Sequence, residues 1–176
     1  DFARITKIPP LWKGENAKQY GNPLQIKVTA DPNAKEDIYY FDFEVTDENY
    51  GEELPTVRLR GKVRVTYDVM DVTVDKTIVK TIPGEPAHFL VTITNKANTG
   101  DTFAVESSGV KRFEFYKTVY VPAQSSKTIS YDPRGNEEEI YHTNLKVTST
   151  SSDIVSKEIP LTLIVSSDLV GDYKAT

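Results

Sequence analysis

One phrase occurs twice in this sequence, about a hundred residues apart. Each copy consists of an Asp-Pro pair, a polar loop, an Ile-Tyr pair and a Val-Thr pair, and the copies span residues 31–46 and 132–148. The valine follows the tyrosine by six positions in both copies. An internal repeat of this kind sets the architecture of a chain, so the sequence predicts two modules of one type.

The composition favours β-structure in these modules. The 176 residues suit one large domain or two small ones, and the repeat favours two. Tyrosine (10) and phenylalanine (7) are frequent, and 38% hydrophobic with 27% charged residues suits a globular chain with modest cores. The sequence contains no cysteine, which excludes disulfides, thiolate metal sites and cysteine nucleophiles.

Charge and hydropathy limit the partners and the compartment. A net charge of −5 without a stripe of Lys and Arg argues against a nucleic-acid partner. No run approaches the roughly 18 consecutive apolar residues of a membrane-spanning helix, so no transmembrane segment is expected. Secreted eukaryotic domains often carry disulfides, so the sequence favours an extracellular location on a prokaryotic cell. The start at Asp1, without a methionine or signal peptide, indicates a processed or excised product.

Apolar and polar residues alternate in short runs bounded by turn residues, which predicts strands with one buried face. Three such runs lie at 24–28, 39–45 and 57–65. The second module begins near Asp71 and contains about seven or eight runs as far as Val165, the number typical of an immunoglobulin-like sandwich.

The predicted fold class is therefore all-β, with tandem immunoglobulin-like antiparallel β-sandwiches. The predicted domains are residues 1–69, residues 70–167 and a C-terminal tail at 168–176. The link at 67–71 contains neither glycine nor proline, which predicts a short, stiff junction.

The first module is expected to be incomplete. Aligned on the repeat it retains its last three strands, and residues 1–22 can supply one or two irregular strands but not four. An N-terminal truncation would explain the difference, and so would completion of the sandwich by another chain. Strand addition from 155–166 or from 167–176 of a neighbouring copy is one version of the second explanation.

Residues 83–166 resemble the immunoglobulin-like repeats of archaeal and bacterial surface-layer-like proteins, which are also appended to some α-galactosidases. The matching pieces are Pro83-Gly84-Glu85, Phe89 to Asn95, Gly100-Asp101-Thr102-Phe103, Val121-Pro122-Ala123 and the strand of Tyr141. Residues 24–66 look like the end of another copy. Glu139-Ile140 stands where the family often has Pro and Gly. The resemblance implies a spacer, adhesion module or surface-layer element that carries no chemistry.

No catalytic residue is predicted. The two histidines, His88 and His142, lie at the starts of predicted strands. Each falls on the face opposite the apolar residues of its strand, which is typical of surface positions. The sequence has no Gly-x-Ser-x-Gly elbow, no His-Glu-x-x-His and no P-loop. The serine-rich stretch 149–152 is expected to be a hairpin loop without a neighbouring base, so the chain is not expected to be an enzyme.

Calcium is the one cofactor that the sequence suggests. Calcium prefers six to eight hard oxygen ligands, which carboxylate-rich loops can provide. The candidates crowd one loop and the link between the modules: Asp47, Glu48, Glu52, Glu53, Asp68 and Asp71. The alternative is that these acidic loops are solvated and bind no metal.

Arg58, Arg60 and Arg64 lie on one face of a predicted strand, and Trp12 lies in the irregular N-terminal segment. The arginine face is either solvated or docks on an acidic neighbour such as the loop 47–53 of another copy. Trp12 is either an anchor for its segment or a contact for sugar or a partner chain.

Tyr39 and Tyr141 each begin the strand that follows the polar loop of the repeat. This placement resembles a tyrosine corner, in which the hydroxyl bonds to nearby backbone.

These observations predict a non-catalytic structural module of a prokaryotic cell-surface protein. Its partners would be other copies or other domains of a surface protein, with no nucleic acid. The alternative is a carbohydrate-binding or adhesion module, and its exposed aromatic candidates are Trp12, Tyr20, Tyr50 and Tyr116.

Overall fold

The structure is a computed structural model that describes residues 2–18, 21–49, 52–53 and 56–170. The chain divides into two compact units, Asp1–Thr66 (unit 1) and Tyr67–Thr176 (unit 2). The regular structure in these ranges is β-strand apart from two short 3-10 helices. No helix in the described part of the chain has the length and apolarity needed to cross a membrane.

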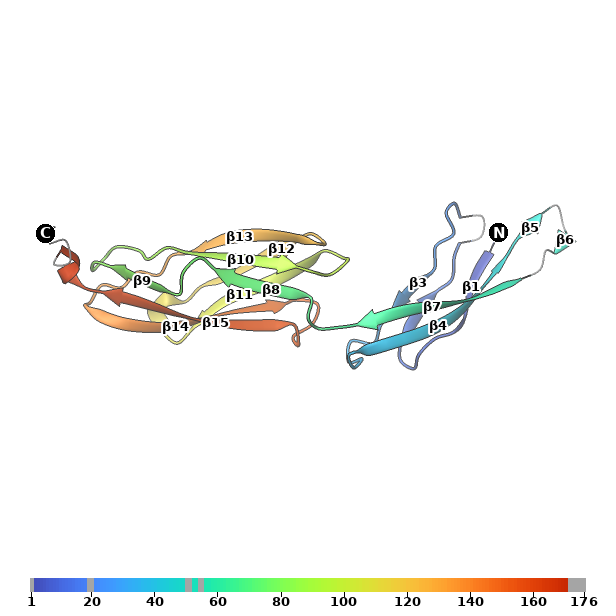
Figure 1. Cartoon of the computed structure of the whole chain (residues 1–176), viewed down its shortest axis with the longest axis horizontal. Coiled ribbons are helices and arrows are strands. Elements are labelled where there is room, and N and C mark those ends of the chain that lie inside the picture. The colour runs from blue at the N-terminus through green and yellow to red at the C-terminus, as the bar shows by residue number, and fades with distance from the viewer. Residues whose placement is uncertain (1, 19–20, 50–51, 54–55, 171–176) are drawn as a thin grey trace, which may run out of the picture. The chain divides into compact units, whose positions relative to one another are not determined.

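Unit 2 contains two sheets, which can be followed in Figure 1. Its strands are β8 (Met70–Val74), β9 (Ile78–Thr81), β10 (Phe89–Asn95), β11 (Asp101–Ser108), β12 (Tyr116–Val121), β13 (Ser125–Tyr131), β14 (Glu139–Ser149) and β15 (Ser156–Val165). One sheet has the order β13-β10-β8 and the other β12-β11-β14-β15-β9. All neighbours are antiparallel except β9, which pairs in parallel with β15 at the sheet edge.

The inward faces of the two sheets share one apolar core, so unit 2 is a β-sandwich. Alternate residues of β10 are fully buried, as the apolar alternation of the sequence requires: Phe89, Val91 and Ile93. The facing sheet contributes Leu145 and Leu163, which are also fully buried. In the described part of the chain, no buried side-chain nitrogen or oxygen lacks a hydrogen-bond partner.

Unit 1 has three small sheets, with the orders β1-β4-β7, β2-β3 and β5-β6. Its strands are β1 (Phe2–Lys7), β2 (Lys13–Glu15), β3 (Lys27–Thr29), β4 (Asp37–Thr46), β5 (Glu48–Asn49), β6 (Glu52–Glu53) and β7 (Val57–Val65). The N-terminal segment thus supplies two strands, β1 and β2. The run expected at 24–28 is a strand only at 27–29, where it pairs with β2.

The hairpins that contain the repeated phrase have the same strand register in both units. Asp37 pairs with Val65 in the β4–β7 hairpin, and Glu139 pairs with Val165 in the β14–β15 hairpin. The third strand of each sheet, β1 or β11, also has the same register. Ala3 of β1 pairs with Val45 in unit 1, and Val105 of β11 pairs with Val147 in unit 2. The sheet β1-β4-β7 therefore corresponds strand for strand to β11-β14-β15.

The tyrosines of the repeat make the same backbone contact in both units. The Tyr39 hydroxyl donates to the Lys35 carbonyl at 3.0 Å, and the Tyr141 hydroxyl donates to the Glu137 carbonyl at 3.4 Å. The acceptor lies four residues before the tyrosine in each case. The expectation that each hydroxyl bonds to nearby backbone is confirmed.

We expect Tyr141→Phe to lower the free energy of unfolding of unit 2 by about 0.5–1 kcal/mol, because a neutral hydrogen bond contributes about that much and this one is long. Urea unfolding followed by circular dichroism measures the change. Tyr39→Phe is the matched variant in unit 1. An unchanged midpoint in both variants would show that neither hydroxyl stabilises its corner.

One sequence prediction about unit 2 is wrong. Strand β15 is paired on both sides, with β14 and with β9, so residues 156–165 are not available as a strand for another chain.

Phe113 lies in the 3-10 helix Lys111–Phe113, where its ring contacts the ring of Tyr141 at a centroid distance of 5.1 Å.

Candidate interaction surface

The outer face of the β4–β7 hairpin carries a row of ion pairs between the strands. Arg60 Nε lies 2.7 Å from Asp42 Oδ1, and the two residues are directly opposite in the strand register. Glu44 accepts from Arg58 on β7 at 3.0 Å and from Arg4 on β1 at 2.9 Å. The guanidinium of Arg60 also lies over the ring of Tyr40. Cross-strand pairs of opposite charge support the register of the sheet.

Arg58 and Arg60 each bind an acid on the neighbouring strand, and the side chains of both stay largely exposed. Docking of this face on the acidic loop of another copy stays a prediction. Arg64 lies opposite Ile38, and Lys62 lies opposite Tyr40, so neither cation has an acid as its direct cross-strand partner. None of the ion pairs among the described residues includes Arg64 or Lys62.

The arginines fix the protonation state of both acids. The hydrogen bond from Arg60 lowers the pKa of Asp42, and the hydrogen bond from Arg4 lowers the pKa of Glu44. Both acids line a surface hollow of about 520 Å³ together with Arg58 and Leu59. A glycosidase needs one carboxyl group that stays protonated as the general acid, and neither of these carboxylates meets that requirement.

Unit 1 should lose stability in acid, because both acids have lowered pKa values in the folded state. Their contribution is fully present above the unfolded values and is lost as pH falls below about 4, through the folded pKa values. The fluorescence of Trp12 measures the transition of unit 1 specifically, since it is the only tryptophan in the sequence. In a double variant with Asp42→Asn and Glu44→Gln, this part of the acid dependence should disappear. If the double variant loses stability in acid as the wild type does, Asp42 and Glu44 are not the source of this pH dependence.

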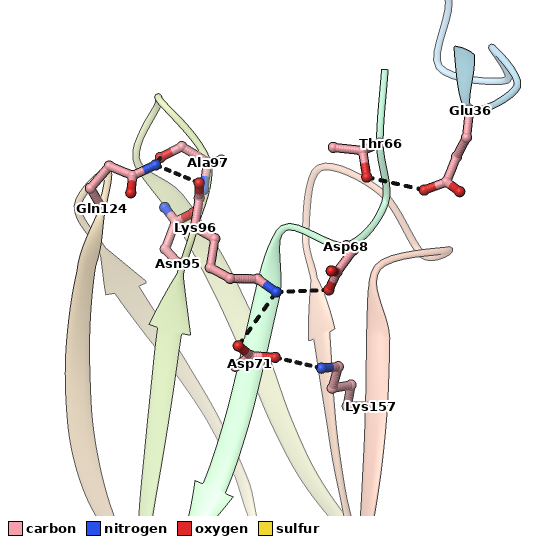
Figure 2. A network of polar contacts seen from close by, with 9 residues as sticks. All are labelled: Glu36, Thr66, Asp68, Asp71, Asn95, Lys96, Ala97, Gln124 and Lys157. Carbon is pink, nitrogen blue, oxygen red and sulfur yellow. Dashed lines mark hydrogen bonds and ion pairs between the residues drawn. The ribbon is translucent and has the colours of Figure 1, made fainter. Parts of the chain in front are cut away.

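In unit 2 a chain of alternating charges joins β8, β15 and the end of β10, as Figure 2 shows. Lys96 Nζ lies 2.8 Å from Asp68 Oδ1 and 3.4 Å from Asp71 Oδ2, and Lys157 Nζ lies 2.8 Å from Asp71 Oδ1. The hydrogen bond from Lys157 lowers the pKa of Asp71, and the one to Asp68 raises the pKa of Lys96. The Lys96 backbone N–H also donates to the Val69 carbonyl at 2.8 Å, so residues 68–71 are held to unit 2 at several points.

The six calcium candidates divide between the two units. Asp68 and Asp71 bind lysines in unit 2. In unit 1, Glu48 and Glu53 face each other in the backbone ladder of the β5–β6 hairpin, and the side chains of Glu48, Glu52 and Glu53 lie outside the described residues. Asp47, which precedes that hairpin, is exposed. Among the described residues no group of three or more His, Asp or Glu could hold a metal ion.

Calcium at the acidic hairpin therefore stays a prediction. Calcium bound there should raise the unfolding midpoint of unit 1, reported by Trp12, and leave that of unit 2 unchanged, because a ligand stabilises only the fold that binds it. Titration calorimetry at millimolar calcium should show heat. If calcium produces no heat and no shift in the unfolding midpoint, the chain does not bind calcium.

In unit 2, Ser130 and His88 each form a hydrogen bond with Asp132. His88 Nδ1 lies 2.7 Å from Asp132 Oδ1, and the Ser130 hydroxyl donates to the same oxygen at 2.5 Å. The serine bond and, less strongly, the histidine lower the pKa of Asp132. A nucleophilic serine passes its proton to an imidazole, whereas here the carboxylate lies between serine and histidine. These three residues thus differ from a catalytic triad in connectivity.

The serine-rich stretch forms the predicted loop between β14 and β15. Its hydroxyls bind the carboxylate of Asp101, with Ser149 donating to Oδ2 at 2.5 Å and Ser151 donating to Oδ1 at 2.8 Å. These bonds join the loop to the first residue of β11, which gives the serines a structural role.

Trp12 is 8% exposed and packs against Tyr39 with a ring-centroid distance of 4.8 Å. Its backbone N–H donates to the Pro9 carbonyl, as that of Phe113 donates to Val110 in unit 2. Phe113 lies against Tyr141 in the same way, so Trp12 has the position of an anchor rather than of an exposed sugar contact. Of the other aromatic candidates, Tyr116 is 69% exposed, and Tyr20 and Tyr50 lie outside the described residues.

No family model and no curated protein matches this sequence. Solved structures match it at low identity. A chain of the complex of zinc 2-glycoprotein and prolactin-inducible protein from human seminal plasma has a TM-score of 0.44 and 9% identity, covering 56% of this chain and 95% of that chain.

Two further matches are single domains. The PapD-like domain 7 of human CEP192 has a TM-score of 0.39 and 11% identity, covering 60% of this chain and 89% of that chain. The CARDB domain of a Pyrococcus furiosus protein, solved with di-metal ions, has a TM-score of 0.38 and 16% identity, covering 58% of this chain and 95% of that chain. These two neighbours are immunoglobulin-like β-sandwich folds.

Proposed function

We propose that this chain is a non-catalytic structural part of a prokaryotic cell-surface protein, built from tandem immunoglobulin-like modules that make protein–protein contacts. The observation that carries the proposal is the shared register of β1-β4-β7 and β11-β14-β15. Repetition of one rigid module, without a chemical site of its own, is the usual design of a spacer or of an assembling surface layer.

The side-chain chemistry supports a structural role. The acids of the β4–β7 face are bound by arginines, and Asp71 is bound by two lysines. Charged groups arranged in this way hold strands in register and are poorly suited to proton transfer, which requires a pKa near the working pH. In unit 2, the alternation that buries one face of each sheet leaves polar outer faces for lateral contacts.

Surface labelling tests the proposal. An antibody raised against unit 2 should label intact cells of the source organism as strongly as it labels lysed cells. Labelling only after lysis would contradict the surface assignment. A cytosolic protein of the same cells serves as the control for leakage.

A further inference from the structure

The correspondence between the units shows which strands of unit 2 have no counterpart in the described part of unit 1. In unit 2, β15 is covered along its outer edge by the parallel strand β9, and β13 is paired with β10. The hairpin register makes β7 the equivalent of β15, and β3 corresponds to β13 by its position just before the Asp-Pro pair of the repeat. Both lie at sheet edges, and no further strand pairs with either of them in the described part of unit 1.

Burial shows the consequence for the inner face of β4 and β7. In unit 2 the inward residues Leu145, Val147 and Leu161 are at most 1% exposed. Their counterparts in unit 1, Phe43 and Val45 of β4 and Gly61 of β7, are all partly exposed. The next residue on this face, Leu59, is 46% exposed.

In the described part of unit 1, no large aliphatic residue is buried. Its buried hydrophobic residues among those described are Trp12 and three alanines, Ala3, Ala17 and Ala34. We use the term open face for the inward side chains of β4 and β7: Tyr39, Phe41, Phe43, Val45, Leu59, Val63 and Val65. Apolar side chains that share one face of a sheet and stay partly exposed are typical of an interaction site in a stable protein.

We propose that the open face of unit 1 binds an extended polypeptide segment with the pattern of β9 and β10. The segment would place one strand parallel to Lys62–Val65 and a second strand antiparallel to β3, with bulky apolar side chains at alternate positions facing Phe43 and Val63. This is recognition by strand addition, in which backbone hydrogen bonds give affinity and alternate side chains give specificity. The inference rests on the proposed correspondence of the two modules.

Charge specifies the outer face of the incoming strand. In unit 2 the parallel pairing places Ile78 beside Thr162 and Lys80 beside Ile164, where the β15 residues are uncharged. The corresponding residues of β7 are Lys62 and Arg64, which have no acid as a direct cross-strand partner and take part in none of the ion pairs among the described residues. The strand that docks on β7 therefore carries Asp or Glu at the positions of Ile78 and Lys80.

The test uses the full chain and a synthetic peptide of residues 70–96. This peptide contains β8, β9 and β10, and unit 2 shows how these strands pair with their neighbours. Bound peptide should raise the unfolding midpoint reported by Trp12 and slow hydrogen exchange at Lys62–Val65. A second peptide with Ile78→Glu and Lys80→Glu should bind about threefold to tenfold more tightly, and the gain should fall with added salt.

Val63→Asp in the acceptor is the matched negative control. Val63 is already partly exposed, so the variant should retain the Trp12 signal of folded unit 1 but lose the response to both peptides. To exclude failure through weak affinity, the acidic peptide is also joined to Asp1 through a Gly/Ser linker, which raises its effective concentration.

Absence of protection at Lys62–Val65 in the tethered protein would overturn strand addition while leaving the surface-labelling result untouched. A mass that rises with concentration without peptide, together with protection of β7, would show a second copy on the open face and would also overturn the proposal. Equal binding of the two peptides would contradict the acidic outer face.

Discussion

Leu145→Ala should lower the free energy of unfolding of unit 2 by about 2–5 kcal/mol. Leu145 is 0% exposed in the middle of β14, between β11 and β15. Removal of a buried leucine side chain loses its transfer free energy and leaves a cavity that the surrounding strands fill only in part. Urea unfolding of the full chain by circular dichroism gives the change for unit 2, and Trp12 fluorescence follows unit 1 separately.

Phe43 provides the matched control, because it occupies the position of Leu145 in the corresponding strand of unit 1. A buried phenylalanine costs about 3–5 kcal/mol when it is replaced by alanine, but Phe43 is partly exposed and should cost less than half of that. Equal losses at the two positions would show that the open face is covered in solution. With the tethered segment in place, the cost at Phe43 should rise toward the cost of a buried residue.

The sequence predicted those features that depend on local pattern. The repeated phrase predicted the first strand of each of the two hairpins, β4–β7 and β14–β15. The polar loop before Tyr39 and Tyr141 predicted that each tyrosine hydroxyl bonds to nearby backbone. Alternation located the buried positions of β10 and β14. These predictions held because spacing along one strand determines which side chains share a face.

Features that depend on the choice of neighbouring strand were missed. Alternation carries no information about the direction of a partner, so the parallel pairing of β9 with β15 was not predicted, and β15 was wrongly considered a free donor strand. Phe113 has the spacing of a strand residue, but its packing against Tyr141 places it in a 3-10 helix.

The ion pairs of the outer face could have been found. Asp42 and Glu44 alternate on one strand, and Arg58 and Arg60 alternate on the next, so a hairpin register through the repeated tyrosine brings the pairs together. The prediction considered only the basic strand, as either a solvated face or one that docks on an acidic neighbour, and did not align that strand with the acids of β4. The prediction that unit 1 is incomplete came from the count of strands, whereas the ion pairs depend on the register of individual residues.

Asn95→Asp should destabilise unit 2 by about 3–5 kcal/mol at neutral pH, although it replaces one nitrogen by one oxygen. Asn95 is 1% exposed, and its side-chain amide donates to the carbonyls of Thr99 at 2.9 Å and Val121 at 3.1 Å, while its oxygen accepts from the Ala97 N–H. The substitution removes both donated bonds and points a charged oxygen at two carbonyl oxygens in the interior.

Two comparisons separate charge from lost hydrogen bonds at Asn95. Asn95→Ala leaves the two carbonyls and the Ala97 N–H without their partner but adds no charge, so its cost at neutral pH should be smaller than that of Asn95→Asp. The aspartate variant should regain part of its stability relative to the alanine variant in mild acid, because a protonated carboxyl group can again donate to one carbonyl. Equal stability of the two variants across this pH range would show that the turn at 95–99 relaxes and admits water.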